Sequence, residues 1–328
     1  MQFISLSVSA RVYNLPLADG TTWSIRGLGS TGAWVGYLAR LMSLAEAGGP
    51  PTHRLTFVRA GEDCVARPDT AEFLPVQAGD AWETVYYLGS CTLYHRQAPE
   101  AVCQLPPWEA TRPDWSRDER WIRAKHVAAV EPVYRAAEAL GGLRCHGALA
   151  ECAGVGAMLL GPSGAGKSTI CRAAHGPWRV LCDDECLIVR TPDAAYRAHP
   201  FPTWSNCLAP SHNASWPVPS HVPVGGLFFL EQQPRPGCRA LTPERTAALL
   251  GSLSLAAFGR RRWGVLRGPA CRRALTEMAA NVCHIAAAVP GFVLGVGTPE
   301  DAWVTLSEVP ALQVPRLSAG RQRGHVGA

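Results

Sequence analysis

The sequence contains few charged residues and almost no lysine. Asp, Glu, Lys and Arg together make up 17% of the 328 residues, against roughly 25% in typical globular proteins. The basic residues are 29 arginines and only two lysines, Lys125 and Lys167. A net charge of +5 is too small and too dispersed to favour nucleic-acid binding. The hydrophobic fraction of 47% suffices for a sizeable core and excludes disorder over most of the chain.

Long apolar runs and cysteine pairs with CxxC spacing are also missing. The uncharged run Met278–Pro299 is interrupted by Asn281, His284 and Pro290, so we expect no membrane span there. The first residues lack the basic start and apolar block of a secretory signal, which favours a cytoplasmic location. The 12 cysteines include no CxxC pair. We therefore expect most of them to be buried, reduced thiols rather than disulfides or metal ligands.

Residues 1–115 are expected to form a small α+β domain that ends in a linker. One helical pattern runs from Gly32 to about Ala47. Runs rich in Val, Tyr, Thr and Phe favour strands around it. The expected strands are Phe3–Val12, Thr21–Ile25, His53–Val58 and Thr84–Tyr94. The Pro-rich stretch QLPPWEATRPDWS then marks the expected domain boundary.

Residues 116–315 alternate between strand and helix patterns, which predicts an α/β core. Ser116 and Glu119 have capping-box spacing at the start of a helix that we expect to end at Gly141-Gly142 and to bend or split at Pro132. The strands expected after it are Ala148–Cys152, Gly156–Leu160, Arg179–Cys182, Val224–Leu230 and Gly291–Gly295, and the helices are Lys167–Ala174, Pro243–Phe258 and Pro269–Ala288. Residues 316–328 are expected to form a flexible tail.

A glycine-rich motif predicts a phosphate-binding loop. The residues Gly161, Pro162, Ser163, Gly164, Ala165, Gly166, Lys167 and Ser168, with Thr169 next, fit G-x-x-x-x-G-K-[ST] completely. In this motif the glycines let backbone N–H groups turn toward phosphate oxygens, the lysine contacts the β- and γ-phosphates, and the hydroxyl after it ligates Mg²⁺. The motif follows an apolar run and precedes a helical pattern. We therefore expect these nine residues to bind a nucleotide together with Mg²⁺.

Two adjacent acids follow the loop at the end of a strand-like run. One carboxylate of Asp183-Asp184 is suited to hold Mg²⁺, and the other could orient or deprotonate an attacking hydroxyl. The alternative is a plain ATPase in which one aspartate holds the metal and Asp184 is a turn residue. Glu185 is expected to face solvent. His146 receives no role from the residues alone, because a lone histidine is more often structural than catalytic.

Two further segments allow more than one interpretation. Phe201–Trp216 is long, aromatic and poor in regular pattern, which favours a substrate-facing loop over a packed one. The Arg260–Arg262 run would suit contacts with phosphates or an acidic peptide. A solvated surface is the simpler interpretation of that run.

The order of these motifs resembles the HPr kinase/phosphorylase superfamily. H-G-A-L from His146, then G-V-G-A-M-L-L-G-P-S-G-A-G-K-S, then V-L-C-D-D-E follow one another as in that family, over about His146–Arg190. More particularly, the chain is similar to the HPr-kinase-like proteins of ribosomal-peptide gene cassettes, such as those of lasso peptides and the SynChlorMet cassette. It departs from the family pattern at Thr169, where the family has Glu, and in the downstream segment that carries acidic metal ligands in the family.

The resemblance implies a P-loop kinase core of the HPr kinase/PEP carboxykinase-like type and a Mg-ATP-dependent kinase. Asp184 would be the base toward an acceptor serine, with His146 near it. Lys167 would stabilise phosphate charge, while Ser168 and Asp183 would serve Mg²⁺. The implied acceptor is a small protein or peptide, such as a ribosomally made peptide precursor, and the family's habit implies a homo-oligomer. Two alternatives stay open: a kinase acting on a small molecule such as free serine, and a P-loop ATPase or ATP-binding module without a phosphoacceptor.

Overall fold

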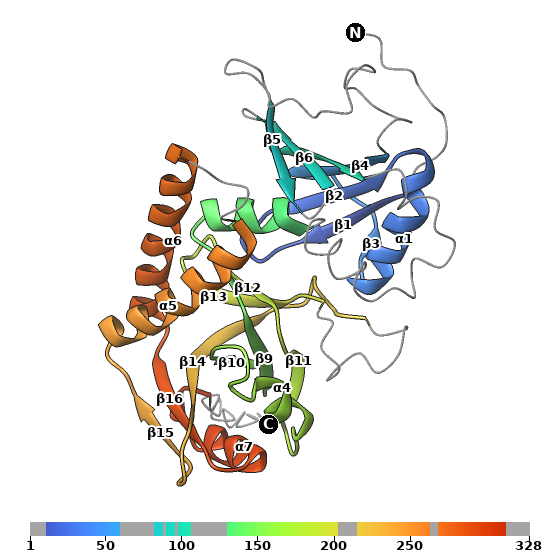
Figure 1. The fold of residues 1–328 in the computed structure, drawn as a ribbon. Helices are drawn as coiled ribbons and strands as arrows, with labels where there is room; N and C mark the ends of the chain where they lie inside the picture. Colours follow the sequence, from blue (N-terminus) through green and yellow to red (C-terminus); the bar gives the residue numbers. More distant parts are fainter. Residues whose placement is uncertain are drawn as a thin grey trace, which may run out of the picture.

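The computed structural model describes residues 11–59, 82–87, 90–95, 98–105, 130–202, 215–262 and 268–312. In these ranges the chain forms two β-sheets on which helices are packed (Figure 1). The expected linker, the capping box at Ser116 and the tail from residue 316 lie outside these ranges. The expected boundary at residue 115 therefore stays a prediction.

The first sheet has seven strands in the order β3-β1-β2-β4-β7-β6-β5. The strands are β1 (Val12–Pro16), β2 (Thr22–Gly27), β3 (Ala45–Glu46), β4 (His53–Arg59), β5 (Trp82–Tyr87), β6 (Ser90–His95) and β7 (Glu100–Leu105). β4 is parallel to its neighbours β2 and β7, and the other pairs are antiparallel. The helix α1 (Gly32–Leu41) packs against this sheet, with the ring of Trp34 4.7 Å from that of Phe57.

Several expected elements of this region differ from the structure. The run Thr84–Tyr94 is two strands, β5 and β6, paired as a hairpin. α1 ends at Leu41 rather than near Ala47, because Ser43 adopts a positive φ of 54° and the chain turns into β3. The sequence patterns did not indicate β7. The expected strand Phe3–Val12 lies almost entirely outside the described residues.

The second sheet is mixed, with parallel strands at its centre. Its main path is β11-β9-β10-β14-β13-β12-β8, β16 lies beside β14, and β15 pairs with β16. The strands are β8 (Leu143–Cys145), β9 (Gly147–Cys152), β10 (Val155–Leu160), β11 (Arg179–Cys182), β12 (Cys186–Arg190), β13 (Tyr196–Pro200), β14 (Val222–Gln232), β15 (Gly237–Ala240) and β16 (Gly291–Val296). β14 is parallel to both β10 and β16. This region is thus a mixed α/β arrangement.

Helices cover both faces of this second sheet. They are α4 (Lys167–Arg172), α5 (Pro243–Arg262), α6 (Gly268–Ala288) and α7 (Pro299–Ser307). Met158 and Leu160 of β10 are buried in one cluster with residues of α5 and α6. Ala157 and Leu159, which point to the other face, are buried in a second cluster with residues of α4 and α7. The central strands are therefore apolar on both faces, which explains their continuous hydrophobic runs.

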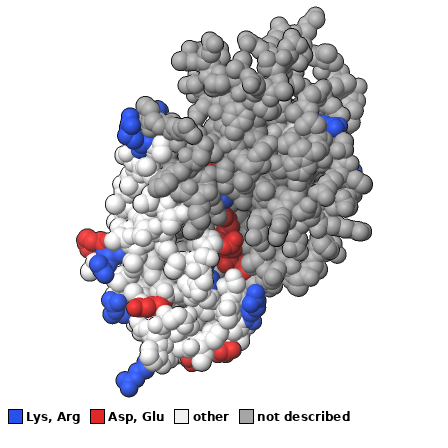
Figure 2. Space-filling model, in the orientation of Figure 1, with Lys and Arg blue, Asp and Glu red and all other residues white. Residues whose placement is uncertain are grey.

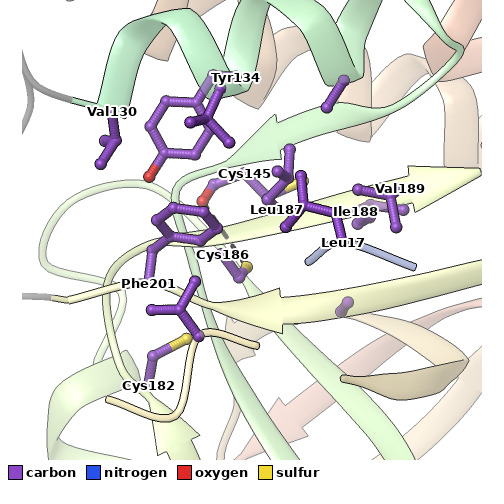
Figure 3. Close-up of a cluster of buried hydrophobic side chains, with 14 of the residues drawn as sticks. Leu17, Val130, Tyr134, Cys145, Cys182, Cys186, Leu187, Ile188, Val189 and Phe201 are labelled. Atoms are coloured by element: carbon purple, nitrogen blue, oxygen red, sulfur yellow. Dashed lines mark hydrogen bonds between the residues drawn. The ribbon is translucent and has the colours of Figure 1, made fainter. Parts of the chain in front are cut away.

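The two sheets share one hydrophobic core. A single cluster of buried residues contains side chains of both, and the backbone N–H of Trp216 donates to the carbonyl of Leu41 at 2.8 Å. A helix over residues 130–139 packs onto the same cluster, where the ring of Tyr134 lies 4.9 Å from that of Phe201 (Figure 3). The expected segment Phe201–Trp216 is thus buried at both ends, while its middle, residues 203–214, lies outside the described residues.

The end of the helix over residues 130–139 and the burial of the cysteines agree with the sequence patterns. Gly141 has a left-handed φ of 92°, and the N–H of Gly142 donates to the carbonyl of Ala137 at 2.8 Å, which closes the helix. Residues 130–139 are one helix that includes Pro132, so the expected split is absent from this stretch. Five of the nine cysteines that the structure describes are buried free thiols, three are half-buried and Cys283 is exposed; the buried ones are Cys103, Cys145, Cys171, Cys182 and Cys186.

A buried histidine connects the first sheet to the second. His199 on β13 is fully buried, and its Nε2 accepts a hydrogen bond from the N–H of Ala18, which follows β1, at 3.1 Å. Its Nδ1 lies 2.8 Å from the carbonyl of Val218. These two contacts require a neutral ring that carries its proton on Nδ1. Burial lowers the pKa of His199 to about 4, against the bond to Val218, and nearby His221 and Arg197 lower it further.

We expect the protein to lose stability as the pH falls below about 6.5, because an unfolded chain protonates histidine near that pH. Folded His199 stays neutral down to a pKa of about 4. Its contribution to the free energy of unfolding is therefore complete above pH 6.5 and is lost between pH 6.5 and 4, by up to about 3 kcal/mol. Urea unfolding at pH 7 and 5 measures the loss, which should shrink in His199→Gln but not in His175→Gln at an exposed position. Equal losses in both variants would contradict this assignment.

Candidate functional site

The glycine-rich loop connects β10 to α4, as the motif predicts. Gly164 and Gly166 have φ values of 85° and 96°, in the left-handed region that glycine adopts without strain. A Cβ added to Gly161 would lie 2.8 Å from the Cβ of Ala165. The N–H of Ala165 donates to the carbonyl of Pro162 at 3.1 Å and closes the turn. Each glycine of the motif thus has a conformational or steric reason in this loop.

Lys167 is the first residue of α4 and is only 6% exposed. Its Nζ donates to the carbonyls of Gly161 at 2.8 Å and Pro162 at 3.1 Å, so the ammonium group lies against the start of the loop. α7 packs against α4, and the indole Nε1 of Trp303 on α7 donates to the carbonyl of Ile170 on α4 at 2.9 Å. Ser168 and Thr169 follow Lys167 in α4.

The pairing of β9 with β10 places His146 and Asp184 beside this loop. Gly147, the first residue of β9, is opposite Leu160, the residue directly before the loop. The N–H of Gly147 donates to the carbonyl of Asp184 at 3.1 Å. The side chains of His146 and Asp184 also meet, with Nδ1 3.0 Å from Oδ1. The structure therefore brings together the histidine and the second acid that the sequence analysis selected.

The two adjacent aspartates differ in exposure. Asp183 is fully buried, whereas the side chain of Asp184 is 40% exposed and that of its partner His146 is 20% exposed. Of this acid pair, Asp184 is therefore the carboxylate that a molecule arriving from solvent can reach.

Glu185 does not face solvent, and this expectation is wrong. Its side chain is 7% exposed and forms a hydrogen-bonded ion pair with Nε of Arg144 on β8. Arg144 also donates from Nη1 to Oε2 of Glu131 at 3.0 Å. The reason lies in the strand pairing: Leu187 of β12 is opposite Arg144 of β8, so the chain enters β12 next to this buried guanidinium. Arg144 and Glu131 had no signal in the sequence patterns.

Gln232 is a third residue that sequence reasoning missed. It ends β14, and its Nε2 donates to the carbonyl of Ala165 in the loop at 3.4 Å. β14 is the parallel neighbour of β10, and ligands bind at the carboxyl ends of parallel strands in open α/β sheets. The E-Q-Q sequence directly after the apolar run Val224–Leu230 was the available signal.

Surface charge is mixed on the side of the molecule drawn in Figure 2. Acidic atoms lie near the middle of this face and also at its left and lower edges, and separate basic groups lie among them and around the edge. The Arg260–Arg262 run ends α5, but the side chains of these residues lie outside the part that the structure describes. Among the helices of the described ranges, none is both long and apolar enough to cross a membrane.

A protein-family model described as SynChlorMet cassette protein ScmC matches residues 108–309, more than half of the chain. The chain belongs to the ScmC family. The ScmC match contains the glycine-rich loop, His146, the acid pair and the whole described part of the second sheet, whereas β1 to β7 precede it. No curated protein matches the chain.

A substitution at Gly147 tests how closely β9 approaches β10 beside the loop. A Cβ there would lie 2.7 Å from Cδ2 of Leu160 and 3.0 Å from the carbonyl oxygen of Leu159. We expect Gly147→Ala to lower the free energy of unfolding by about 1–3 kcal/mol, as overpacking does. Gly48→Ala is the control, because a Cβ at Gly48 meets nothing within 4 Å. Urea denaturation measures both, and equal small effects would show that the approach is not tight.

Proposed function

We propose that the chain is a Mg-ATP-dependent kinase of the HPr-kinase-like type, which transfers the γ-phosphate to a serine or other hydroxyl of a small protein or peptide. One observation carries the proposal: the glycine-rich loop that ends in Lys167 starts directly beside the His146–Asp184 pair. A phosphate cradle and a candidate base therefore belong to one site.

The residues of the loop fit a nucleoside triphosphate. The left-handed glycines allow backbone N–H groups to converge on phosphate oxygens, and a Cβ at Gly164 would meet nothing within 4 Å. Lys167 would exchange its bonds to two carbonyls for bonds to phosphate oxygens. The expected loop residues follow directly after β10, and the last three of them, from Lys167 to Thr169, form the first turn of α4.

The donor set near the loop fits Mg²⁺. Ser168 offers a hydroxyl and Asp183 offers a carboxylate, and such oxygen atoms are the ligands that this ion prefers. Within the described ranges, no three or more His, Cys, Asp or Glu side chains are grouped to hold a metal. Mg²⁺ commonly binds through one or two carboxylates together with substrate phosphates and water, so such a group is not required. Mg²⁺ would offset the charge of the phosphates during transfer.

Asp184 supplies the base in this proposal. The hydroxyl proton of the acceptor passes to its carboxylate while the hydroxyl oxygen bonds to the γ-phosphorus, and the bond from that phosphorus to the β-phosphate oxygen breaks to leave ADP. His146, 3.0 Å from Oδ1, orients the carboxylate. The exposure of Asp184 allows a hydroxyl on a peptide to reach it.

A peptide or small protein is the acceptor that we favour, because the sequence resembles kinase-like proteins of ribosomal-peptide cassettes. The resemblance to the HPr kinase family is also the basis for proposing a homo-oligomer. A kinase for a small molecule such as free serine would use the same core. An ATPase without a phosphoacceptor is less favoured, because it gives no role to the contact between His146 and Asp184.

Lys167→Met tests nucleotide binding. Loss of a charged donor to phosphate should weaken Mg-ATP binding about 30-fold or more, which corresponds to about 2 kcal/mol. Lys125→Met, at the only other lysine of the chain, is the matched control and should bind as the wild type does. Isothermal titration calorimetry measures both affinities. Unchanged affinity in Lys167→Met would remove the basis for ATP binding at this loop.

Asp184→Asn tests the transfer step. The amide cannot take up the hydroxyl proton, so transfer should fall by about 10²- to 10⁴-fold, while Mg-ATP affinity stays near that of the wild type. Asp193→Asn changes an exposed aspartate in the turn between β12 and β13 and is the control. Each variant and the wild type are incubated with labelled ATP and a cell extract. The label transferred is measured, and mass spectrometry identifies the phosphoacceptor.

Normal transfer by Asp184→Asn would refute the assignment of the base. The assay offers proteins, peptides and metabolites as acceptors. If the phosphate label then appears only as inorganic phosphate, the result would favour the ATPase.

A further inference from the structure

A buried ion cluster lies behind the His146–Asp184 pair. Arg144 forms ion pairs with Glu131, from the helix over residues 130–139, and with Glu185, from the segment between β11 and β12. The three side chains are 6%, 10% and 7% exposed. The ring of Tyr134 covers the guanidinium, 4.0 Å from its Cζ. We call Arg144, Glu131 and Glu185 the Arg144 clamp.

Arg144 keeps its positive charge in spite of its burial. Desolvation alone would lower the pKa of Arg144, but the charge of Glu185, the Tyr134 hydroxyl, the charge of Glu131 and the bond to Glu185 together raise this pKa above its ordinary value. Taking three charges out of water is costly, and apolar side chains of similar volume often stabilise a fold equally well. Stability alone therefore does not account for a buried cluster at this place.

The position of the clamp suggests what else it does. Arg144 is two residues before His146, and Glu185 is directly after Asp184, so one ion pair joins the two segments that carry the candidate catalytic pair. Backbone bonds fix the same segments: the N–H of Gly147 donates to the carbonyl of Asp184, and the N–H of Phe201 donates to the carbonyl of Glu185, both at 3.1 Å. Any shift of Glu185 would move Asp184 relative to the loop.

We propose that the Arg144 clamp is a positioning network, which fixes Asp184 and His146 at the start of the glycine-rich loop. Its members touch neither nucleotide nor acceptor and act through Asp184. The catalytic consequence rests on the proposed kinase function, whereas the fixing of the segment does not.

Amide hydrogen exchange tests the fixing without any need for activity. Glu185→Gln and Glu131→Gln each keep the shape of the side chain and remove one charge of the clamp. The reporter is the N–H of Gly147, which bonds to Asp184, and we expect it to exchange about tenfold faster or more in both variants. The N–H of Ile170, which bonds to the carbonyl of Gly166 in α4, should keep its wild-type rate.

Glu151→Gln is the matched control for the loss of a Glu–Arg pair. Glu151 pairs with Arg179 at 2.6 Å near the other end of β9, on the surface. This variant should leave the exchange of Gly147 and the turnover of the enzyme unchanged. Because Glu131→Gln leaves the pair of Arg144 with Glu185 intact, it serves as the milder variant if Glu185→Gln does not fold.

Steady-state kinetics tests the catalytic consequence. In both clamp variants kcat should fall by about 10²-fold, the size expected from a small misplacement of a catalytic group, while the Kd for Mg-ATP stays within about threefold, or 0.7 kcal/mol. Arg144→Lys keeps the buried charge but lacks the planar fork that holds two carboxylates at once. It should therefore retain a kcat between those of the wild type and Glu185→Gln.

The outcomes separate the two claims. Faster exchange at both Gly147 and Ile170 would show that the cluster only stabilises the fold, and it would overturn the proposal. Faster exchange at Gly147 alone, with an unchanged kcat, would overturn the proposed effect on catalysis. A wild-type protein that neither binds nor turns over ATP would refute the proposed function instead. In that case the exchange of Gly147 would still decide whether the clamp fixes the segment.

Discussion

The close approach of β9 to β10 at Gly147 is the constraint on which the candidate site depends. Gly147 is opposite the last residue of the strand that leads into the glycine-rich loop, and the space for a side chain at this position is already filled by Leu160 and the Leu159 carbonyl. The N–H of Gly147 also bonds to Asp184. A single glycine thus allows the strand before the loop, the histidine preceding β9 and the acid following β11 to meet at one point.

The surrounding structure holds this meeting point from several sides. α7 anchors α4 through the bond from Trp303, so the helix that carries Lys167 and Ser168 is fixed relative to the sheet. On the other side, the guanidinium of Arg144 binds the segment that follows Asp184. The acids of the site thus differ in burial: Asp183 and Glu185 are buried, and Asp184 between them is partly exposed. This division suits a site in which one carboxylate reacts while its neighbours hold position or metal.

Local patterns in the sequence revealed the loop, its strand and helix, and the acid pair, because those features depend on contiguous residues. Features that depend on distant pairing were missed. Glu185 was expected in solvent because its partner Arg144 is 41 residues away, and Gln232 is 67 residues from the Ala165 carbonyl that it binds. The shared core of the two sheets was missed for the same reason, since the contact of Trp216 with Leu41 has no signature in either segment. His146 was selected only through a family resemblance, and its contact with Asp184 becomes visible in the fold.

The central claim is that the loop and the His146–Asp184 pair act on the same phosphate. A crystal structure of the protein with Mg²⁺ and a non-hydrolysable ATP analogue tests this claim most directly. We expect the γ-phosphate to contact Lys167 Nζ, the metal to contact the Ser168 hydroxyl, and the Asp184 carboxylate to face the γ-phosphorus on the side away from the β-phosphate. A nucleotide bound elsewhere, or bound in the loop with its γ-phosphate turned away from Asp184, would contradict the account.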